Sequence, residues 1–146
     1  MAADRSFFDQ VQDAFEGFVA DVDGELHATA HKRGLKVWFD DANREHYEAQ
    51  LIRLEGEAAL EVGFHTEYPK VEQNDGVLAW LLQHEAAWRT ELGDEPVAGE
   101  FLGAARWRRI SETWEPPNPD DVDAAIEVAA RLAEYVTAIE PVRRSG

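Results

Sequence analysis

Apolar and polar residues alternate between residues 25 and 67, and this pattern constrains the fold of the chain more than any other feature. Successive side chains of a β-strand point to opposite faces, so alternation predicts strands with one buried and one polar face. Turn-like residues at 40–43 and at Gly56 divide the stretch into three runs, and connections this short join antiparallel neighbours. We therefore predict a three-stranded antiparallel meander, in which residues 25–30 form either an additional strand or an extension of the first one.

Helical spacing of apolar residues follows on both sides of this region. Residues 6–20 predict a helix with one apolar face made of Phe8, Val11, Phe15 and Phe18. Ser6 is placed to cap the first turn. Residues 75–92 carry a second apolar stripe and are followed by Gly93, a residue type that often ends helices. The two segments therefore predict one helix each.

The C-terminal third of the chain predicts two short strands and a long helix. Residues 99–114 have strand-like content, whereas residues 122–139 repeat apolar residues at positions i, i+3 and i+4 over about five turns. Arg143 and Arg144 are expected just beyond the end of this last helix. The predicted order is thus α-β-β-β-α-β-β-α.

One antiparallel sheet with helices on one face would bury every apolar stripe in this order. The length of 146 residues and the 45% content of hydrophobic residues suit one domain with a real core. We predict a single acidic globular α+β domain spanning residues 1–146, with a single antiparallel sheet of about five strands and three helices.

The charge balance limits the classes of partner. Thirty acidic residues against 14 lysines and arginines give a formal net charge of −16, which repels phosphate backbones and anionic lipid surfaces. We expect no binding to nucleic acid or to membranes. The charge either keeps the protein soluble or forms an acidic surface that recognises a basic partner. The first residues lack an apolar signal core, and cytoplasmic localisation is expected.

Strand parity gathers polar residues on the sheet face opposite to the core. Leu60, Val62 and Phe64 are predicted to point into the core, so the residues between them point the other way. If the strands pair in order, the polar face gathers Lys36, Trp38, Glu48, Gln50, Glu61, His65 and Glu67. A histidine between carboxylates can move a proton near neutral pH. The alternative is the solvated face that many antiparallel sheets possess.

The run 106–109 is a basic island in an acidic chain. In a strand, Trp107 and Arg109 share one face, and the guanidinium could bind a carboxylate or phosphate in a bidentate manner. The alternative is that these arginines pair with the surplus of acidic side chains.

No metal site is predicted. His27 and His31 have a spacing that brings two imidazoles together on a helix, but in a strand they would lie about 13 Å apart. The pair His65 and Glu67 adds only one imidazole and one carboxylate. The chain has no cysteine, which excludes disulfides, thiolate catalysis and cysteine-ligated metals. We expect no cofactor.

No motif in the sequence specifies a reaction: glycine-rich phosphate loops, nucleophile elbows, dinucleotide fingerprints and calcium loops are all missing. The first expectation is a non-catalytic module that binds a protein partner or its own copy, based on the acidic surface and on Trp38. The second is a small-ligand-binding domain. Its candidate residues are Lys36, Trp38, Glu61, His65, Glu67, Trp107 and Arg109. The third is a hydrolase that uses His65 with Glu61 or Glu67.

Overall fold

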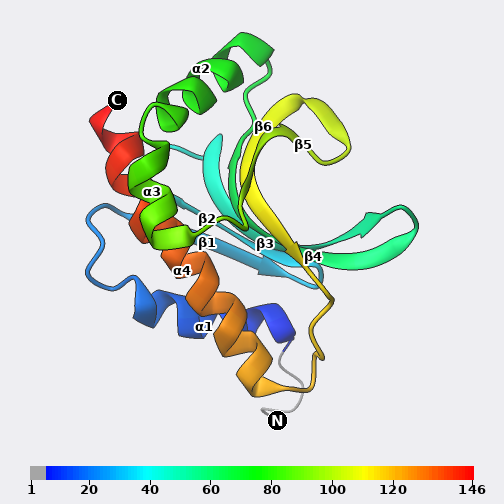
Figure 1. Cartoon of the computed structure of the whole chain (residues 1–146). Coiled ribbons are helices and arrows are strands. Elements are labelled where there is room, and N and C mark those ends of the chain that lie inside the picture. Colours follow the sequence, from blue (N-terminus) through cyan, green and yellow to red (C-terminus); the bar gives the residue numbers. More distant parts are fainter. Residues whose placement is uncertain (1–5) are drawn as a thin grey trace.

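The structure is a computed structural model and describes residues 6–146. Within these residues the chain forms one six-stranded antiparallel sheet, in the order β1-β2-β3-β4-β6-β5, and four helices (Figure 1). The strands are β1 (Leu26–His31), β2 (Gly34–Phe39), β3 (Glu45–Leu54), β4 (Glu57–Thr66), β5 (Val97–Phe101) and β6 (Ala104–Trp114). The helices are α1 (Phe7–Phe18), α2 (Val71–Leu82), α3 (Glu85–Leu92) and α4 (Val122–Ser145).

The α+β class and the single antiparallel sheet are confirmed, but the predicted numbers of strands and helices are too low. Of residues 25–30, all but Glu25 belong to a separate strand, β1, which pairs with β2 across a two-residue turn. The helix predicted over residues 75–92 is two helices. The carbonyl of Leu81 accepts hydrogen bonds from the backbone of His84 (3.0 Å) and from the indole of Trp88 (2.8 Å), and the helix is interrupted at this point.

The helix ends agree with the sequence in part. Ser6 caps α1, because its Oγ accepts a hydrogen bond from the backbone N–H of Asp9 at 3.1 Å. Phe18 was predicted to share the apolar face of α1, but its side chain is 51% exposed. Arg143 and Arg144 were expected beyond the last helix but lie inside its final turn, where both form ion pairs with Glu140.

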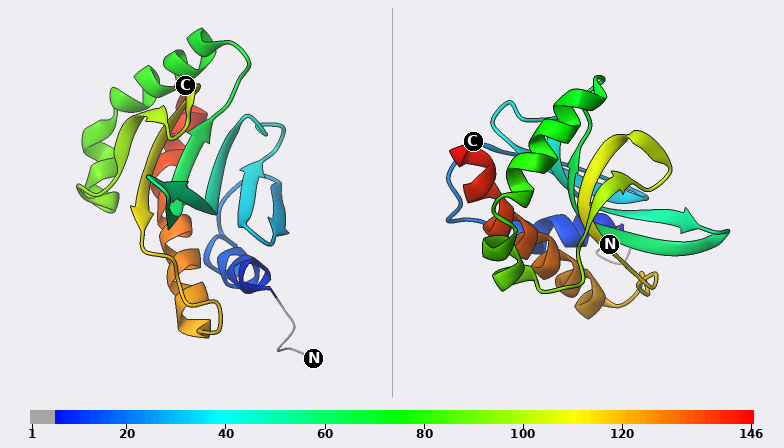
Figure 2. Two further views of the ribbon diagram at one scale, coloured as in Figure 1. Left: turned by 90° about the vertical axis from the view of Figure 1, so that its right-hand side faces the viewer. Right: turned by 45° about the horizontal axis from the view of Figure 1, so that its top comes forward.

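The core lies between one face of the sheet and the helices α1 and α4. The residues predicted to face the core are buried in the central strands, but on β4 Glu61 and His65 of the opposite face are buried as well. The buried residues that face the core include Leu35, Val37, Phe39, Tyr47, Ala49, Leu60, Val62, Phe64 and Ile110. The left view of Figure 2 looks onto the opposite, curved face of the sheet, with α4 behind it. This second face carries the polar residues.

Glu112 links strand β6 to helix α4 on the core side. Its carboxylate accepts hydrogen bonds from Arg131 (2.8 Å), from the hydroxyl of Tyr135 (2.6 Å) and from the indole of Trp114 (2.7 Å). Burial raises the pKa of Glu112, but the hydrogen bonds from Arg131, Tyr135 and Trp114 outweigh burial and lower it. The ionised form of Glu112 therefore stabilises the fold.

Replacing Glu112 with alanine is expected to lower the free energy of unfolding by about 2–4 kcal/mol, because the change leaves Arg131 and Tyr135 without their carboxylate. Since its folded-state pKa lies below the unfolded value, the contribution of Glu112 is present above about pH 4.3 and is lost as the pH falls through the folded-state pKa. Urea unfolding at several pH values measures both effects. The control is Glu127→Ala on the exposed side of α4, which should change stability by less than about 0.5 kcal/mol.

Candidate metal centre

Two neighbouring strands place histidine and glutamate side chains on the curved, polar face of the sheet. His46 of β3 lies opposite His65 of β4, and Glu48 lies opposite Gly63. Residues paired across antiparallel strands point to the same face, as do residues two apart in one strand. Glu67 continues the ladder just after β4, because its backbone N–H donates to the carbonyl of Arg44 at 2.8 Å.

These residues form a compact group that we call the His–Glu cluster: His46, Glu48, His65 and Glu67. Each offers one nitrogen or oxygen atom, and the four atoms lie within 4.8 Å of one another. The adjacent pairs are His46 Nε2–Glu48 Oε1 (3.0 Å), His46 Nε2–Glu67 Oε2 (3.5 Å), His65 Nδ1–Glu48 Oε1 (3.3 Å) and His65 Nδ1–Glu67 Oε2 (3.4 Å). A tetrahedral ion with bonds of about 2.0–2.1 Å requires ligand atoms roughly 3.3–3.4 Å apart. The four adjacent separations of 3.0–3.5 Å are close to this distance, and the other two separations are at most 4.8 Å.

The cluster is buried on its histidine side and reached by solvent on its glutamate side. Both imidazoles are fully buried, whereas the side chains of Glu48 and Glu67 are 13% and 17% exposed. Phe101 of β5 packs edge-on against the ring of His65, with 4.5 Å between ring centroids. Phe101 in turn contacts Trp107 of β6 at 5.8 Å, so the β5–β6 hairpin covers His65.

In each imidazole, the ring nitrogen that points away from the cluster donates a hydrogen bond. His46 Nδ1 donates to the backbone carbonyl of Asn43 at 3.2 Å, and His65 Nε2 donates to the carboxylate of Glu61 at 2.7 Å. These partners leave His46 Nε2 and His65 Nδ1 directed at the two carboxylates of the cluster. Histidines that bind metals characteristically donate their other nitrogen to a carboxylate or a backbone carbonyl in this way.

Among the buried side-chain polar atoms of residues 6–146, His65 Nδ1 is the one without a hydrogen bond. Two carboxylate oxygens lie 3.3 and 3.4 Å from it, but neither is aligned for a hydrogen bond. A buried nitrogen without a hydrogen-bond partner lowers the stability of a fold, so such atoms are rare in folded proteins. A ligand that binds both the nitrogen and the carboxylates would provide one.

Burial and the neighbouring side chains of the cluster shift the pKa of His65, His46 and Glu48. Burial lowers the pKa of His65, but the charge of Glu61 and the surrounding carboxylates of Glu48, Glu61 and Glu67 together raise it well above its usual value. Burial lowers the pKa of His46, which stays below its usual value. Burial raises the pKa of Glu48, but the two neighbouring histidines lower it far below the usual range. Glu48 is therefore ionised at neutral pH, as a metal ligand must be.

Comparisons with protein families, with curated proteins and with solved structures found no match for this chain. Its function must therefore be argued from the site itself. None of the helices formed by residues 6–146 combines the length and the apolar character needed to cross a membrane.

The structure places the residues predicted from strand parity on one face, but it brings only some of them together. His65 and Glu67 belong to the cluster, and Glu61 adjoins it. Trp38 lies on β2, where its ring is stacked on His27 (5.3 Å between centroids) and covered by the amino group of Lys36 (5.4 Å). Trp38 therefore has partners on the sheet, and the burial of both imidazoles contradicts the alternative of a simple solvated face.

Two arginines of the basic run 106–109 make different kinds of contact. Arg108 forms an ion pair with Asp75 at 2.7 Å, as one alternative predicted. Arg109 is 9% exposed and lies opposite His65, and in the described part of the chain it has no carboxylate within 4.0 Å. Its guanidinium donates instead to the carbonyl of Glu100 (3.2 Å) and to the hydroxyl of Ser111 (3.0 Å). Arg109 is thus part of the scaffold beside the cluster.

The histidine pair considered for a metal in the sequence differs from the pair in the cluster. His27 and His31 lie on β1, outside the cluster, and His46 was not considered at all. The signal that could have found the site is the repeated pattern His-x-Glu, which occurs at His46–Glu48 and at His65–Glu67. Two such patterns on neighbouring antiparallel strands bring four ligands together when the histidines pair.

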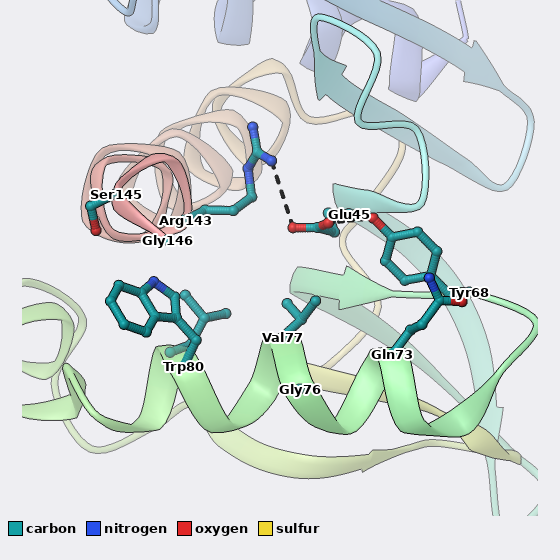
Figure 3. Close-up of a pocket in the computed structure, with 10 residues that line it drawn as sticks. Glu45, Tyr68, Gln73, Gly76, Val77, Trp80, Arg143, Ser145 and Gly146 are labelled. Carbon is teal, nitrogen blue, oxygen red and sulfur yellow. Dashed lines mark hydrogen bonds and ion pairs between the residues drawn. The ribbon is translucent and has the colours of Figure 1, made fainter.

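A separate groove of about 660 Å³ lies between α2 and the C-terminal end of α4 (Figure 3). Val77 and Trp80 point into it from α2. Its polar groups pair with one another, since Glu45 accepts a hydrogen bond from Tyr68 and lies 3.6 Å from Arg143. Glu45 is on the core side of β3, opposite to His46, so this groove is not continuous with the cluster.

Proposed function

We propose that this protein binds a divalent transition-metal ion through His46, Glu48, His65 and Glu67. The observation that carries the proposal is the convergence of two imidazole nitrogens and two carboxylate oxygens at separations of 3.0–3.5 Å. Imidazole ligands favour zinc and its neighbours, whereas magnesium and calcium prefer sites made of oxygen atoms alone. Zinc is therefore the probe of choice.

The partial exposure of the two carboxylates supports a second candidate, the hydrolase expected as the third possibility. An ion reached by water at Glu48 and Glu67 could lower the pKa of a bound water molecule and act as a Lewis acid. The protein-interaction module stays a prediction that rests on the acidic surface, since the ring of Trp38 contacts His27 and Lys36.

Calorimetric titration of chelator-treated protein with zinc tests the proposal. We expect one ion per chain and, at zinc concentrations of about 100 times the dissociation constant, an added stability of about 2.7 kcal/mol. This corresponds to an increase in melting temperature of roughly 5–10 °C for a domain of this size. Magnesium at the same concentration is the control and should leave the melting temperature unchanged. The proposal is wrong if millimolar zinc produces neither heat nor a thermal shift.

A further inference from the structure

The two nitrogens of His65 face different carboxylates. Nε2 lies 2.7 Å from Glu61, whereas Nδ1 lies 3.3 and 3.4 Å from Glu48 and Glu67. A neutral imidazole carries one proton, so the nitrogen that donates a hydrogen bond leaves the other free to bind an ion. We infer that Glu61 is a positioning residue that makes His65 bind the ion through Nδ1. This inference rests on the proposed metal-binding function.

Gly63 lies between Glu61 and His65 on β4, at a position packed closely against β6. Residues 61 and 65 are about 13 Å apart along an extended strand, and their side chains meet by leaning toward each other over residue 63. A side chain at position 63 would be too close to β6, since its Cβ would lie 2.4 Å from the carbonyl oxygen of Ile110.

Neighbouring strands surround the carboxylate of Glu61. On β3, Gln50 donates a hydrogen bond to its Oε1 at 2.9 Å. On β6, the hydroxyl of Ser111 accepts a hydrogen bond from Arg109 at 3.0 Å and helps to lower the pKa of Glu61. A fully buried carboxylate with this many partners has one orientation, and it directs one oxygen at His65 Nε2. The network is therefore built for an acceptor at this position.

The two histidines would bind the ion through different ring nitrogens. His46 donates through Nδ1 to Asn43 and turns Nε2 to the cluster, which is the reverse of His65. Glutamine at position 61 has nearly the same shape as glutamate, but its amide can donate a hydrogen bond to Nε2. It would then favour the tautomer with a proton on Nδ1, where the ion must bind. Glu61→Gln should therefore weaken metal binding without removing a ligand.

Zinc titration of Glu61→Gln, combined with ¹⁵N NMR of the histidine rings, tests the inference. We expect zinc affinity to fall about 10- to 100-fold, as for other carboxylates that orient metal-binding histidines. The matched control is Glu57→Gln, which removes the same charge from an exposed position on β4 and should bind zinc like the unmodified protein. The NMR spectrum of the unmodified, zinc-loaded protein should show zinc on Nδ1 of His65 and on Nε2 of His46.

The outcomes separate the inference from the proposed function. Zinc bound by Nε2 of His65 would overturn the inference and needs no variant, so it remains decisive if Glu61→Gln does not fold. Equal affinity in Glu61→Gln and the unmodified protein would overturn it as well. An unmodified protein that takes up no zinc would instead contradict the proposed function, and the inference with it.

Discussion

Replacing His46 with alanine is expected to lower zinc affinity by about 100- to 1,000-fold. Structural zinc sites with four ligands bind with roughly 10–16 kcal/mol, or about 2.5–4 kcal/mol per ligand when shared equally. His46 contributes one of the nitrogens that lie within 3.5 Å of both carboxylates, and no other imidazole of the cluster can take its place. Calorimetric titration with zinc measures the loss.

Two controls separate the loss of a ligand from the loss of the fold. His27→Ala removes an imidazole that stacks on Trp38 and lies outside the cluster, so zinc affinity should stay within about twofold of the unmodified protein. The melting temperature of His46→Ala should not respond to zinc, although the variant remains folded by circular dichroism. A zinc-dependent shift of full size in this variant would contradict the assignment of His46 as a ligand.

Replacing Gly63 with alanine is expected to lower the free energy of unfolding by about 3 kcal/mol, which corresponds to roughly 10 °C in melting temperature. An added Cβ would lie 2.4 Å from the carbonyl oxygen of Ile110 and 2.5 Å from Cα of Ser111. Both are parts of strand β6, so the strands β4 and β6 must move apart. Because β6 pairs with β4 beside both Glu61 and His65, the same variant should also bind zinc more weakly.

Gly76→Ala is the matched control for this variant. A Cβ at Gly76 meets no atom within 4 Å, and alanine is the better residue inside helix α2. We expect the control to raise the free energy of unfolding by about 0.5–1 kcal/mol. Urea unfolding of both variants gives the two values. Stability of Gly63→Ala equal to that of the unmodified protein would show that β4 and β6 are not packed as closely as described.

The alternating and helical patterns of apolar residues predict most strands and helices of this fold, because each pattern is typical of one kind of element. The alternation in β2, β3 and β4 predicts which residues enter the core, and their burial confirms it. The break between α2 and α3 could not be predicted, because the apolar stripe continues across it. It depends on the indole of Trp88 bonding to the carbonyl of Leu81, which is a contact of the folded chain.

The polar face could be predicted, but the candidate metal centre could not. Parity places Glu48, Glu61, His65 and Glu67 on one side of the sheet, which is a property of each strand alone. Their convergence requires the pairing of His46 with His65, and a shift of this register by two residues would keep every side chain on its face while separating the two histidines.

The amino-acid pattern therefore determines the class of the fold, the faces of the strands and the residue types on each face. It does so because side-chain direction in a strand follows from backbone geometry within a few residues. Only the tertiary structure decides that β3 and β4 pair in this register, and that Phe101 of the β5–β6 hairpin packs against His65. The histidines and glutamates then meet in a buried site, because long-range pairing and burial depend on the whole chain.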